Sequence, residues 1–206
     1  MMRLPGLTFV ILMLAACAGY PAPTIASNEL NIMIMGEDED PSSISRDSQI
    51  FRRVLNSISS ELSNAGYNVI DETAVTLDDF KQGRTRRSDA EVIDIAKSVK
   101  RPPIDVAVLF SIYPEIRRFN YTTKIQVRVE GRLLQVIDGK RLDNIELDLP
   151  AAENAPANCN KVCLRSYVGN VSKQLSQDVS VILTKKLNGE SLKQNILVFF
   201  ILIQVI

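Results

Sequence analysis

Few side chains in this 206-residue sequence could carry out chemistry, and the usual base for nucleophilic catalysis is absent. Serine and cysteine nucleophiles usually need a neighbouring base, most often histidine, and the chain contains no histidine. It also lacks a Gly-x-Ser-x-Gly elbow, a P-loop and a dinucleotide fingerprint. Carboxylates at Asp78-Asp79 and within 37–40 could do acid–base work or hold a hard cation, but their spacing fits no calcium loop. We therefore predict no catalytic residue and interpret these acids as solvated turn residues.

Cysteine is the other reactive residue, and its three copies are one near the start, Cys17, and a pair near the end, Cys159 and Cys163. The residues before Cys17 have the plan of a signal peptide: a positive charge at Arg3, an apolar run at 7–14 and small residues at the end. That run is far shorter than the roughly 20 residues with which a helix crosses a bilayer, so a permanent membrane span is disfavoured.

The sequence Leu14-Ala15-Ala16-Cys17 resembles the lipobox of bacterial lipoproteins, in which apolar and small residues precede the cysteine that receives the lipid. The resemblance implies cleavage before Cys17 and a covalent diacylglycerol and acyl (palmitate) lipid on it, with no other cofactor. The next residue is Ala18 and not Asp, which implies the periplasmic face of the outer membrane. The alternative is an ordinary secretory signal cut later, for example after Ala26, although that site lies far beyond the apolar run.

If Cys17 carries lipid, Cys159 and Cys163 remain as an even pair in an oxidising compartment, and we expect a disulfide between them. The closed loop is short, so its stabilisation would be about 2 kcal/mol in the chain-entropy model. One alternative is two unpaired thiols at the start of a helix. A metal site is less favoured, because the chain has no histidine and no other cysteine to complete a tetrahedral shell.

The overall charge gives no reason to expect a nucleic-acid partner. The chain has 24 basic and 24 acidic residues, and cleavage before Cys17 removes only Arg3, so the mature chain has a net charge of −1. Two basic clusters bracket the second predicted helix and could form one patch for phospholipid headgroups, lipopolysaccharide or an acidic protein face. The alternative is solvated surface. The two clusters are Arg84, Arg86, Arg87 and Lys97, Lys100, Arg101.

Three helices are predicted by apolar spacing and end signals. Residues 45–66 place apolar side chains three and four apart and end at a glycine. Ser88-Asp89-Ala90-Glu91 has the spacing of a capping box and starts a second helix, whose continuation Pro102-Pro103 forbids. A long third helix runs over about 161–187 and stops at Asn188-Gly189.

Five strands are predicted around these helices. The acidic segment 37–43 after the first strand is expected to be a loop outside the core. Gly131 suggests a bulge in mid-strand, and Asp138-Gly139 indicates a hairpin turn. The strands are 30–35, 67–70, 104–113, 121–137 and 140–149. The order β-α-β-α-β-β-β-α predicts the α/β (α+β) class, with a mixed β-sheet packed by three helices.

Four segments follow from these features. They are a signal peptide at 1–16, the lipidated cysteine and a proline-bearing tether at 17–28, a periplasmic α/β domain at 29–189 and an apolar tail at 190–206. Residues 196–206 are almost unbroken apolar sequence, yet too few to span a bilayer as a helix. This stretch could be an extra strand, a segment for a membrane or a partner, or a coding irregularity at the end of the reading frame.

The lipobox, the tether, this order of elements and the turn Val136-Ile137-Asp138-Gly139-Lys140 resemble a domain found in several envelope proteins, over roughly 30–187. These are the curli-secretion lipoprotein (CsgG), the lipoprotein activators of penicillin-binding proteins (LpoB) and the N-terminal domain of the Tol system's periplasmic protein (TolB). The resemblance implies a non-enzymatic lipoprotein that docks envelope proteins of a secretion, flagellar or cell-wall synthesis machine. A ligand- or peptidoglycan-binding lipoprotein is the alternative. The cysteine pair departs from that group, and the oligomeric state is left open.

Overall fold

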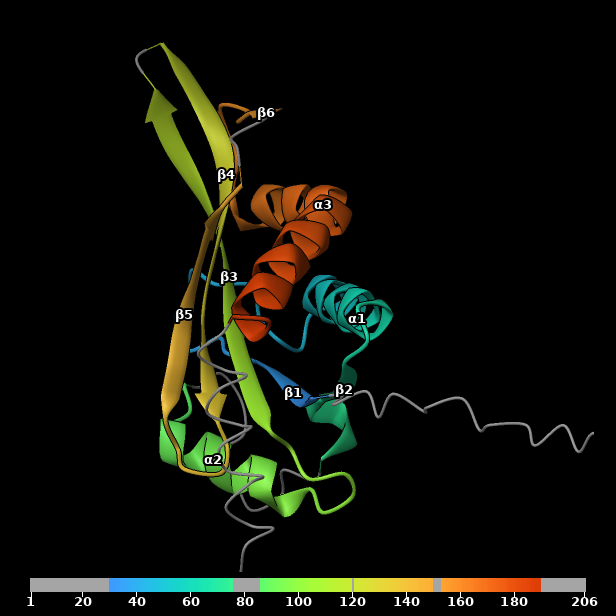
Figure 1. The fold of residues 1–206 in the computed structure, drawn as a ribbon. Coiled ribbons are helices and arrows are strands. Elements are labelled where there is room, and N and C mark those ends of the chain that lie inside the picture. Colours follow the sequence, from blue (N-terminus) through green and yellow to red (C-terminus); the bar gives the residue numbers. More distant parts are fainter. Residues whose placement is uncertain (1–29, 76–85, 120, 150–152, 190–206) are drawn as a thin grey trace, which may run out of the picture.

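The structure is a computed structural model that describes residues 30–75, 86–119, 121–149 and 153–189 (Figure 1). The predicted signal peptide, Cys17, the predicted tether and the apolar tail lie outside the described residues. The elements are β1 (Asn31–Gly36), α1 (Gln49–Asn64), β2 (Asn68–Asp71), η1 (Glu72–Ala74), α2 (Asp89–Ser98), β3 (Val106–Phe119), β4 (Thr122–Gln135), β5 (Arg141–Asp148), β6 (Glu153–Asn154) and α3 (Lys161–Leu187). The predicted fold class and element order are confirmed; the 3-10 turn η1 and the two-residue strand β6 are additions.

The sheet is mixed, as predicted, with the strand order β2-β1-β3-β4-β5, and β6 pairs with β4. β1 is parallel to both of its neighbours, β2 and β3. The pairs β3–β4 and β4–β5 are antiparallel. The parallel strands β1, β2 and β3 therefore begin at the same end of the sheet. β3 extends further than the other two at the opposite end.

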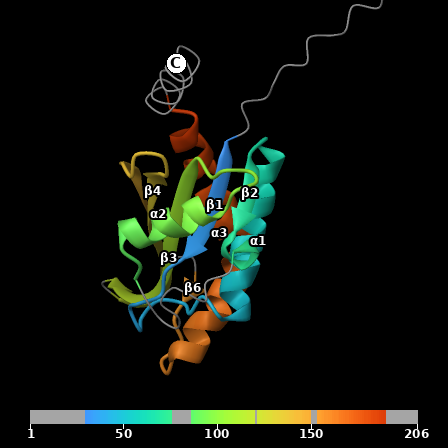
Figure 2. The ribbon, with the colours of Figure 1, turned by 90° about the horizontal axis from the view of Figure 1, so that it is seen from below.

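The two faces of the sheet are covered unequally. Because side chains alternate along a strand, Ile32 and Ile34 of β1 join the large core under α1 and α3, while Met33 and Met35 join a smaller core under α2. In that large core the rings of Phe51 on α1 and Phe110 on β3 stack with centroids 5.1 Å apart. The view in Figure 2 shows α2 crossing one face of the sheet, with α1 and α3 on the other.

Polar side chains begin each of the three helices. Ser48 accepts a hydrogen bond from Phe51 N at the start of α1, and Asn160 accepts from Val162 N at the start of α3. At α2 the predicted capping box is only half correct. Ser88 Oγ accepts from Glu91 N, but the Glu91 carboxylate accepts instead from Arg87 Nη1, at 2.6 Å.

The β3–β4 hairpin is longer than predicted, because β3 continues to Phe119 and pairs with β4 along its whole length. Pro114 does not interrupt this pairing. The carbonyls of Phe110 and Ile112 accept from Glu37 N and Ile44 N on the outer side of β3, so alternate residues turn their backbone groups to that edge. The missing N–H of Pro114 therefore lies at the outer edge and removes no bond to β4.

The predicted bulge at Gly131 is wrong. Gly131 pairs regularly with Phe110 and Ile145, and the register shift lies between Leu133 and Leu134. Glycine is required there by close approach, because an added Cβ would lie 2.2 Å from the carbonyl oxygen of Leu109. The predicted turn after β4 is present, with Gly139 at φ +73°.

Candidate functional site

A charged cavity of about 330 Å³ lies on the face of the sheet opposite α1 and α3, beside the start of α2. Its walls come from the loop after β1, from three successive strands and from the segment before α2. The lining includes carboxylates, arginines and two hydroxyl groups. The residues are Glu37, Glu39, Asp40, Arg86, Ser111, Tyr113, Glu130, Gly131, Arg132, Arg141 and Asn144.

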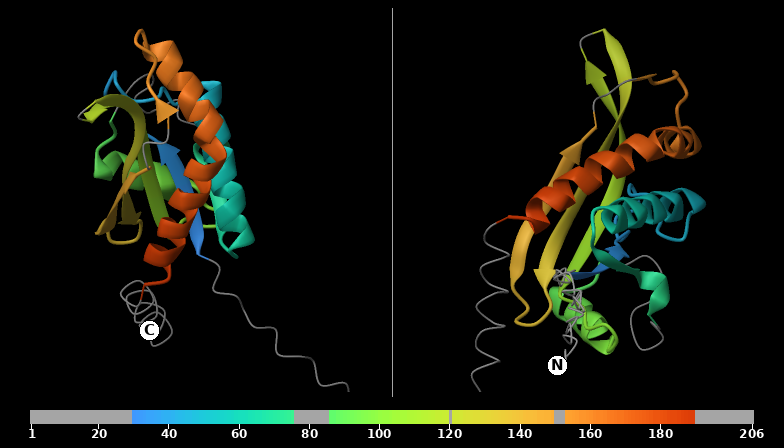
Figure 3. Two further views of the ribbon diagram at one scale, coloured as in Figure 1. Left: turned by 90° about the horizontal axis from the view of Figure 1, so that it is seen from above. Right: turned by 45° about the vertical axis from the view of Figure 1, so that its right-hand side comes forward.

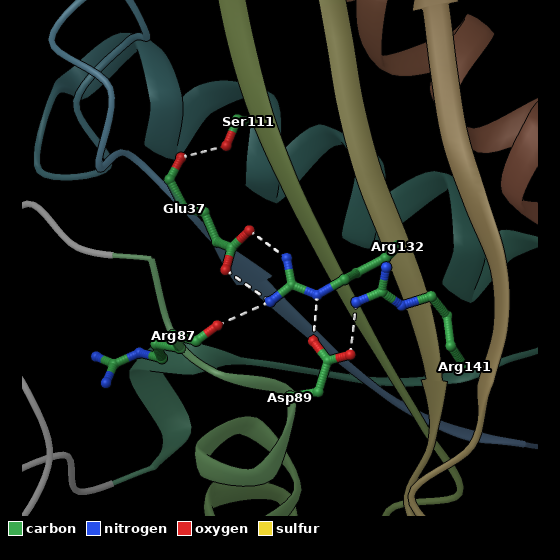
Figure 4. Close-up of polar contacts among 6 residues, drawn as sticks. All are labelled: Glu37, Arg87, Asp89, Ser111, Arg132 and Arg141. Carbon is green, nitrogen blue, oxygen red and sulfur yellow. Dashed lines mark hydrogen bonds and ion pairs between the residues drawn. The ribbon is translucent and has the colours of Figure 1, made fainter.

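Arg132 of β4 is the centre of the hydrogen-bond network at this cavity (Figure 4). Its Nη1 and Nη2 donate to the two carboxylate oxygens of Glu37, the Nη2 contact measuring 2.9 Å. Nη2 also donates to the carbonyl oxygen of Arg87 (2.9 Å), and Nε donates to Asp89 (2.7 Å). Arg132 is 5% exposed, so this charge is satisfied inside the protein.

The start of the acidic loop after β1 is buried, which contradicts the prediction that 37–43 lies outside the core. Glu37 is 7% exposed and Asp38 is 1% exposed. Glu37 pairs with Arg132, and its carbonyl accepts from Ser111 Oγ at 2.7 Å. Asp38 accepts from the backbone N–H of Arg46 at 3.0 Å. These carboxylates are buried because each has a specific partner, and such pairing is not visible in a local sequence pattern.

Asp89, the first residue of α2, links two arginines. Its carboxylate accepts from Arg132 Nε and, at 2.6 Å, from Arg141 Nη2. Burial would raise the pKa of Asp89, but the hydrogen bonds from Arg141 and Arg132 outweigh it and hold the pKa below its ordinary value. The ionised form also suits the N-terminal turn of a helix, where the backbone dipole favours negative charge.

Beyond Arg132, the cavity presents the Tyr113 hydroxyl and charged rim residues. Burial raises the pKa of Tyr113, so its hydroxyl is protonated at neutral pH. Arg132 directs its donors to groups of the protein itself, so a ligand in the cavity would contact rim residues such as Arg141 and Glu39 rather than Arg132. Within the ranges that the structure describes, no cluster of three or more acidic or cysteine side chains is placed to hold a metal ion.

The basic residues predicted as one patch do not lie together. Arg84 is outside the described residues, and Arg86 lines the charged cavity. Arg87 is 1% exposed and pairs with Glu91, so it does not belong to a surface patch. The other cluster lies exposed around the far end of α2. Its members are Lys97, Lys100 and Arg101.

A disulfide joins Cys159 to Cys163, four residues later in the chain. Cys163 lies in the first turn of α3, where its backbone N–H is one of two that donate to the Asn160 side chain. Both cysteines pack at the margin of the large core. The bond therefore fixes the loop before α3 to the first turn of that helix.

The tip of the β3–β4 hairpin is a second candidate surface. It projects beyond α1 and α3 (Figures 1 and 3). In its outer four residue pairs, Ile116 is 40% exposed and Tyr121, in the turn, is fully exposed. From Pro114 onward, no described strand pairs with the outer edge of β3. Sequence patterns did not reveal this surface, because its apolar residues are isolated among charged ones.

None of the helices in the described ranges has the length and hydropathy needed to cross a bilayer. No protein-family model matches the chain. No curated protein sequence matches it significantly.

Solved bacterial structures are similar to the chain at low sequence identity. The lipoprotein GNA1162 of Neisseria meningitidis is 22% identical, with a TM-score of 0.42, over 72% of this chain and 99% of that one. The hypothetical protein CT253 of Chlamydia trachomatis is 9% identical, with a TM-score of 0.46, over 78% and 98%. A minor lipoprotein of Acinetobacter baumannii is 9% identical, with a TM-score of 0.38, over 75% and 91%. Two of these three proteins are named as lipoproteins.

Proposed function

We propose that this chain is a bacterial lipoprotein, anchored in the outer membrane through Cys17, whose folded domain docks another protein of the envelope. The anchor is supported by the lipobox-like Leu14-Ala15-Ala16-Cys17 and by the leader before it. The described domain begins at residue 30, so the intervening chain keeps it within about 45 Å of the lipidated cysteine. Secretion, flagellar and cell-wall synthesis machines are the classes of partner that the resemblance suggests.

The observation that carries the docking function is the exposed tip of the β3–β4 hairpin. Isolated apolar residues on a surface need no explanation, but Ile116 and Tyr121 are exposed on the same hairpin tip, beside an edge of β3 with which no described strand pairs. Aromatic side chains are enriched at protein interfaces, because one ring supplies a large contact area at a small cost in conformational entropy. The tip also extends away from the two helices, where a partner can reach it (Figure 3).

Site-specific photo-crosslinking in intact cells tests this function. A photo-reactive amino acid replaces Tyr121 in one variant and Val181, which is 68% exposed on α3, in the matched control. We expect a discrete protein adduct from position 121 and none from position 181. Adding Ile116→Ser to the first variant should reduce the yield of the adduct. Equal adducts at both positions, or no adduct at position 121, would contradict docking through the hairpin.

The charged cavity favours a second candidate function, the binding of a polar ligand such as a peptidoglycan fragment. Its rim presents both charges, from Arg141 and from carboxylates such as Glu39 and Glu130, to a solute that carries amines and carboxylates. Titration calorimetry with soluble peptidoglycan fragments tests it. Saturable binding that Arg141→Ala weakens, with no protein adduct at position 121, would favour this function over docking.

A further inference from the structure

We infer that the edge of the domain where the chain enters β1 lies against the membrane, and that Lys97, Lys100 and Arg101 contact anionic phospholipid headgroups there. The inference rests on the proposed lipid anchor and adds a second, electrostatic contact between the same domain and the bilayer. It also assigns an orientation to the domain, which the anchor alone does not.

Backbone and side-chain hydrogen bonds place the entry of the tether beside these basic residues. Asn31 N donates to the Asp105 carboxylate at 2.8 Å, and Asp105 N donates to the Asn31 carbonyl at 2.9 Å. A β-bridge between Lys100 and Pro103 folds the turn that leads into this contact. The chain that comes from Cys17 therefore enters the fold next to the turn that carries Lys100 and Arg101.

The three basic side chains are available to an outside partner. Lys97, Lys100 and Arg101 are all exposed, and no described carboxylate forms an ion pair with any of them. Lys100 Nζ donates to the carbonyl oxygen of Lys97, which places its charge at the C-terminal end of α2. Because the mature chain has a net charge of −1, this cluster is a local excess of positive charge.

The β4–β5 turn lies at the same edge and does not cancel the cluster. Val136 N donates to the Asp105 carbonyl at 3.0 Å, which ties the end of β4 to the start of β3. The turn contributes Asp138 and Lys140, both exposed, whose charges offset each other. Asp105 also lies at this edge and bonds to Asn31, so the three residues at the end of α2 leave an excess of positive charge here even when Asp105 is ionised.

The opposite end of the same strand is the hairpin tip. β3 starts at Val106, five residues after Arg101, and runs for 14 residues to Phe119, which is about 45 Å of extended chain. Figure 1 shows α2 and the tip at opposite ends of the molecule. With the basic edge on the bilayer, Tyr121 is held toward the periplasm, where a partner protein can reach it.

Vesicle binding by the unacylated mature chain tests the inference. The probe is residues 17–206 with Cys17→Ser, mixed with vesicles of phosphatidylcholine alone or of equal parts phosphatidylcholine and phosphatidylglycerol. The edge variant combines Lys97→Glu, Lys100→Glu and Arg101→Glu. The matched control combines Arg52→Glu and Arg53→Glu on α1 with Lys173→Glu on α3, all exposed, and so changes the net charge by the same amount.

We expect the parent chain to bind the anionic vesicles at least about tenfold more tightly than the neutral ones, and this preference to disappear in high salt. The edge variant should bind the anionic vesicles about tenfold more weakly than the parent, and the control within about twofold of it. Equal binding by the edge variant and the parent, or no preference of the parent for anionic vesicles, would overturn the inference.

Failure of this inference can be distinguished from failure of the proposed function. The probe carries no lipid and needs no partner protein, so a failure to bind vesicles leaves the anchor and the docking surface untouched. Conversely, a missing acyl group on Cys17 would contradict the proposed anchor without changing the vesicle result. Circular dichroism of both triple variants checks that each remains folded.

Discussion

Arg132 and Glu37, 95 positions apart in the chain, form an ion pair with two hydrogen bonds in which both side chains are less than one-tenth exposed. The pair joins the last part of β4 to the loop that follows β1. Burial opposes the charge on Arg132, but its hydrogen bonds to Glu37 and Asp89 outweigh that effect and raise its pKa further. These bonds fix the position of Arg132 in the lining of the charged cavity.

Replacing one partner of this pair should be costly, and replacing both should not. Arg132→Met leaves the Glu37 carboxylate buried and unpaired, so we expect a loss of about 3–5 kcal/mol in the free energy of unfolding. Glu37→Met combined with Arg132→Met should recover most of that loss, because neither member of the pair is then left buried without its partner. Urea denaturation with the disulfide intact measures both. A double variant no more stable than the single one would contradict this account.

Asp105 should make the stability of the domain depend on pH. Burial raises the pKa of Asp105 despite two hydrogen bonds from Asn31, so its contribution is fully present below the unfolded pKa of about 3.9 and is lost as the pH rises through the folded pKa. Asp105→Asn keeps an acceptor for Asn31 N and removes the ionisation. We expect a higher urea midpoint than the parent at pH 7 and no difference at pH 3. A gain of equal size at both pH values would rule out ionisation as its cause.

Two glycine-to-alanine variants should have opposite effects. Gly131→Ala places a Cβ against the Leu109 carbonyl, which cannot move without disturbing β3, and we expect a loss of about 1–3 kcal/mol or more. Gly169→Ala, in the middle of α3, meets only Ile50 at 3.8 Å or more, and should gain about 0.5–1 kcal/mol. Thermal unfolding of the two variants compares them. A Gly131→Ala variant as stable as the parent would mean that the close approach of β3 and β4 is not required.

The disulfide should contribute modestly to stability. Cys159→Ala with Cys163→Ala removes a bond that closes a loop only four positions long, for which the chain-entropy model gives about 2 kcal/mol. The difference in urea midpoint between this double variant and the parent measures it. Because both cysteines pack at the core margin, the variant should still fold. Complete unfolding would show that the bond holds more than the first turn of α3.

The helices and most strands could be predicted because their apolar residues repeat at the period of each element. The prediction was accurate for α3, whose bounds, Lys161–Leu187, follow a buried face and an Asn-Gly stop. It was incomplete for β3, because the apolar run ends at Pro114. The outer half of that strand is held by backbone pairing with β4, which needs no apolar pattern.

The cavity could not be predicted, because burial of a charge depends on partners far away in the sequence. Arg132 alternates with apolar neighbours as an exposed residue of a half-buried strand would, and nothing local connects it to Glu37. The predicted basic patch failed at Arg87 for the same reason. A glycine in mid-strand is equally ambiguous, since a bulge and a close backbone approach both require one.

Mass spectrometry of the first peptide of the mature protein, isolated from the membrane fraction of its host, tests the central claim most directly. The account predicts that this peptide begins at Cys17 and carries the added mass of a diacylglycerol and acyl chains, and that Cys17→Ala leaves the chain unprocessed and without lipid. A mature chain that begins elsewhere, or a peptide containing an unmodified Cys17, would contradict it.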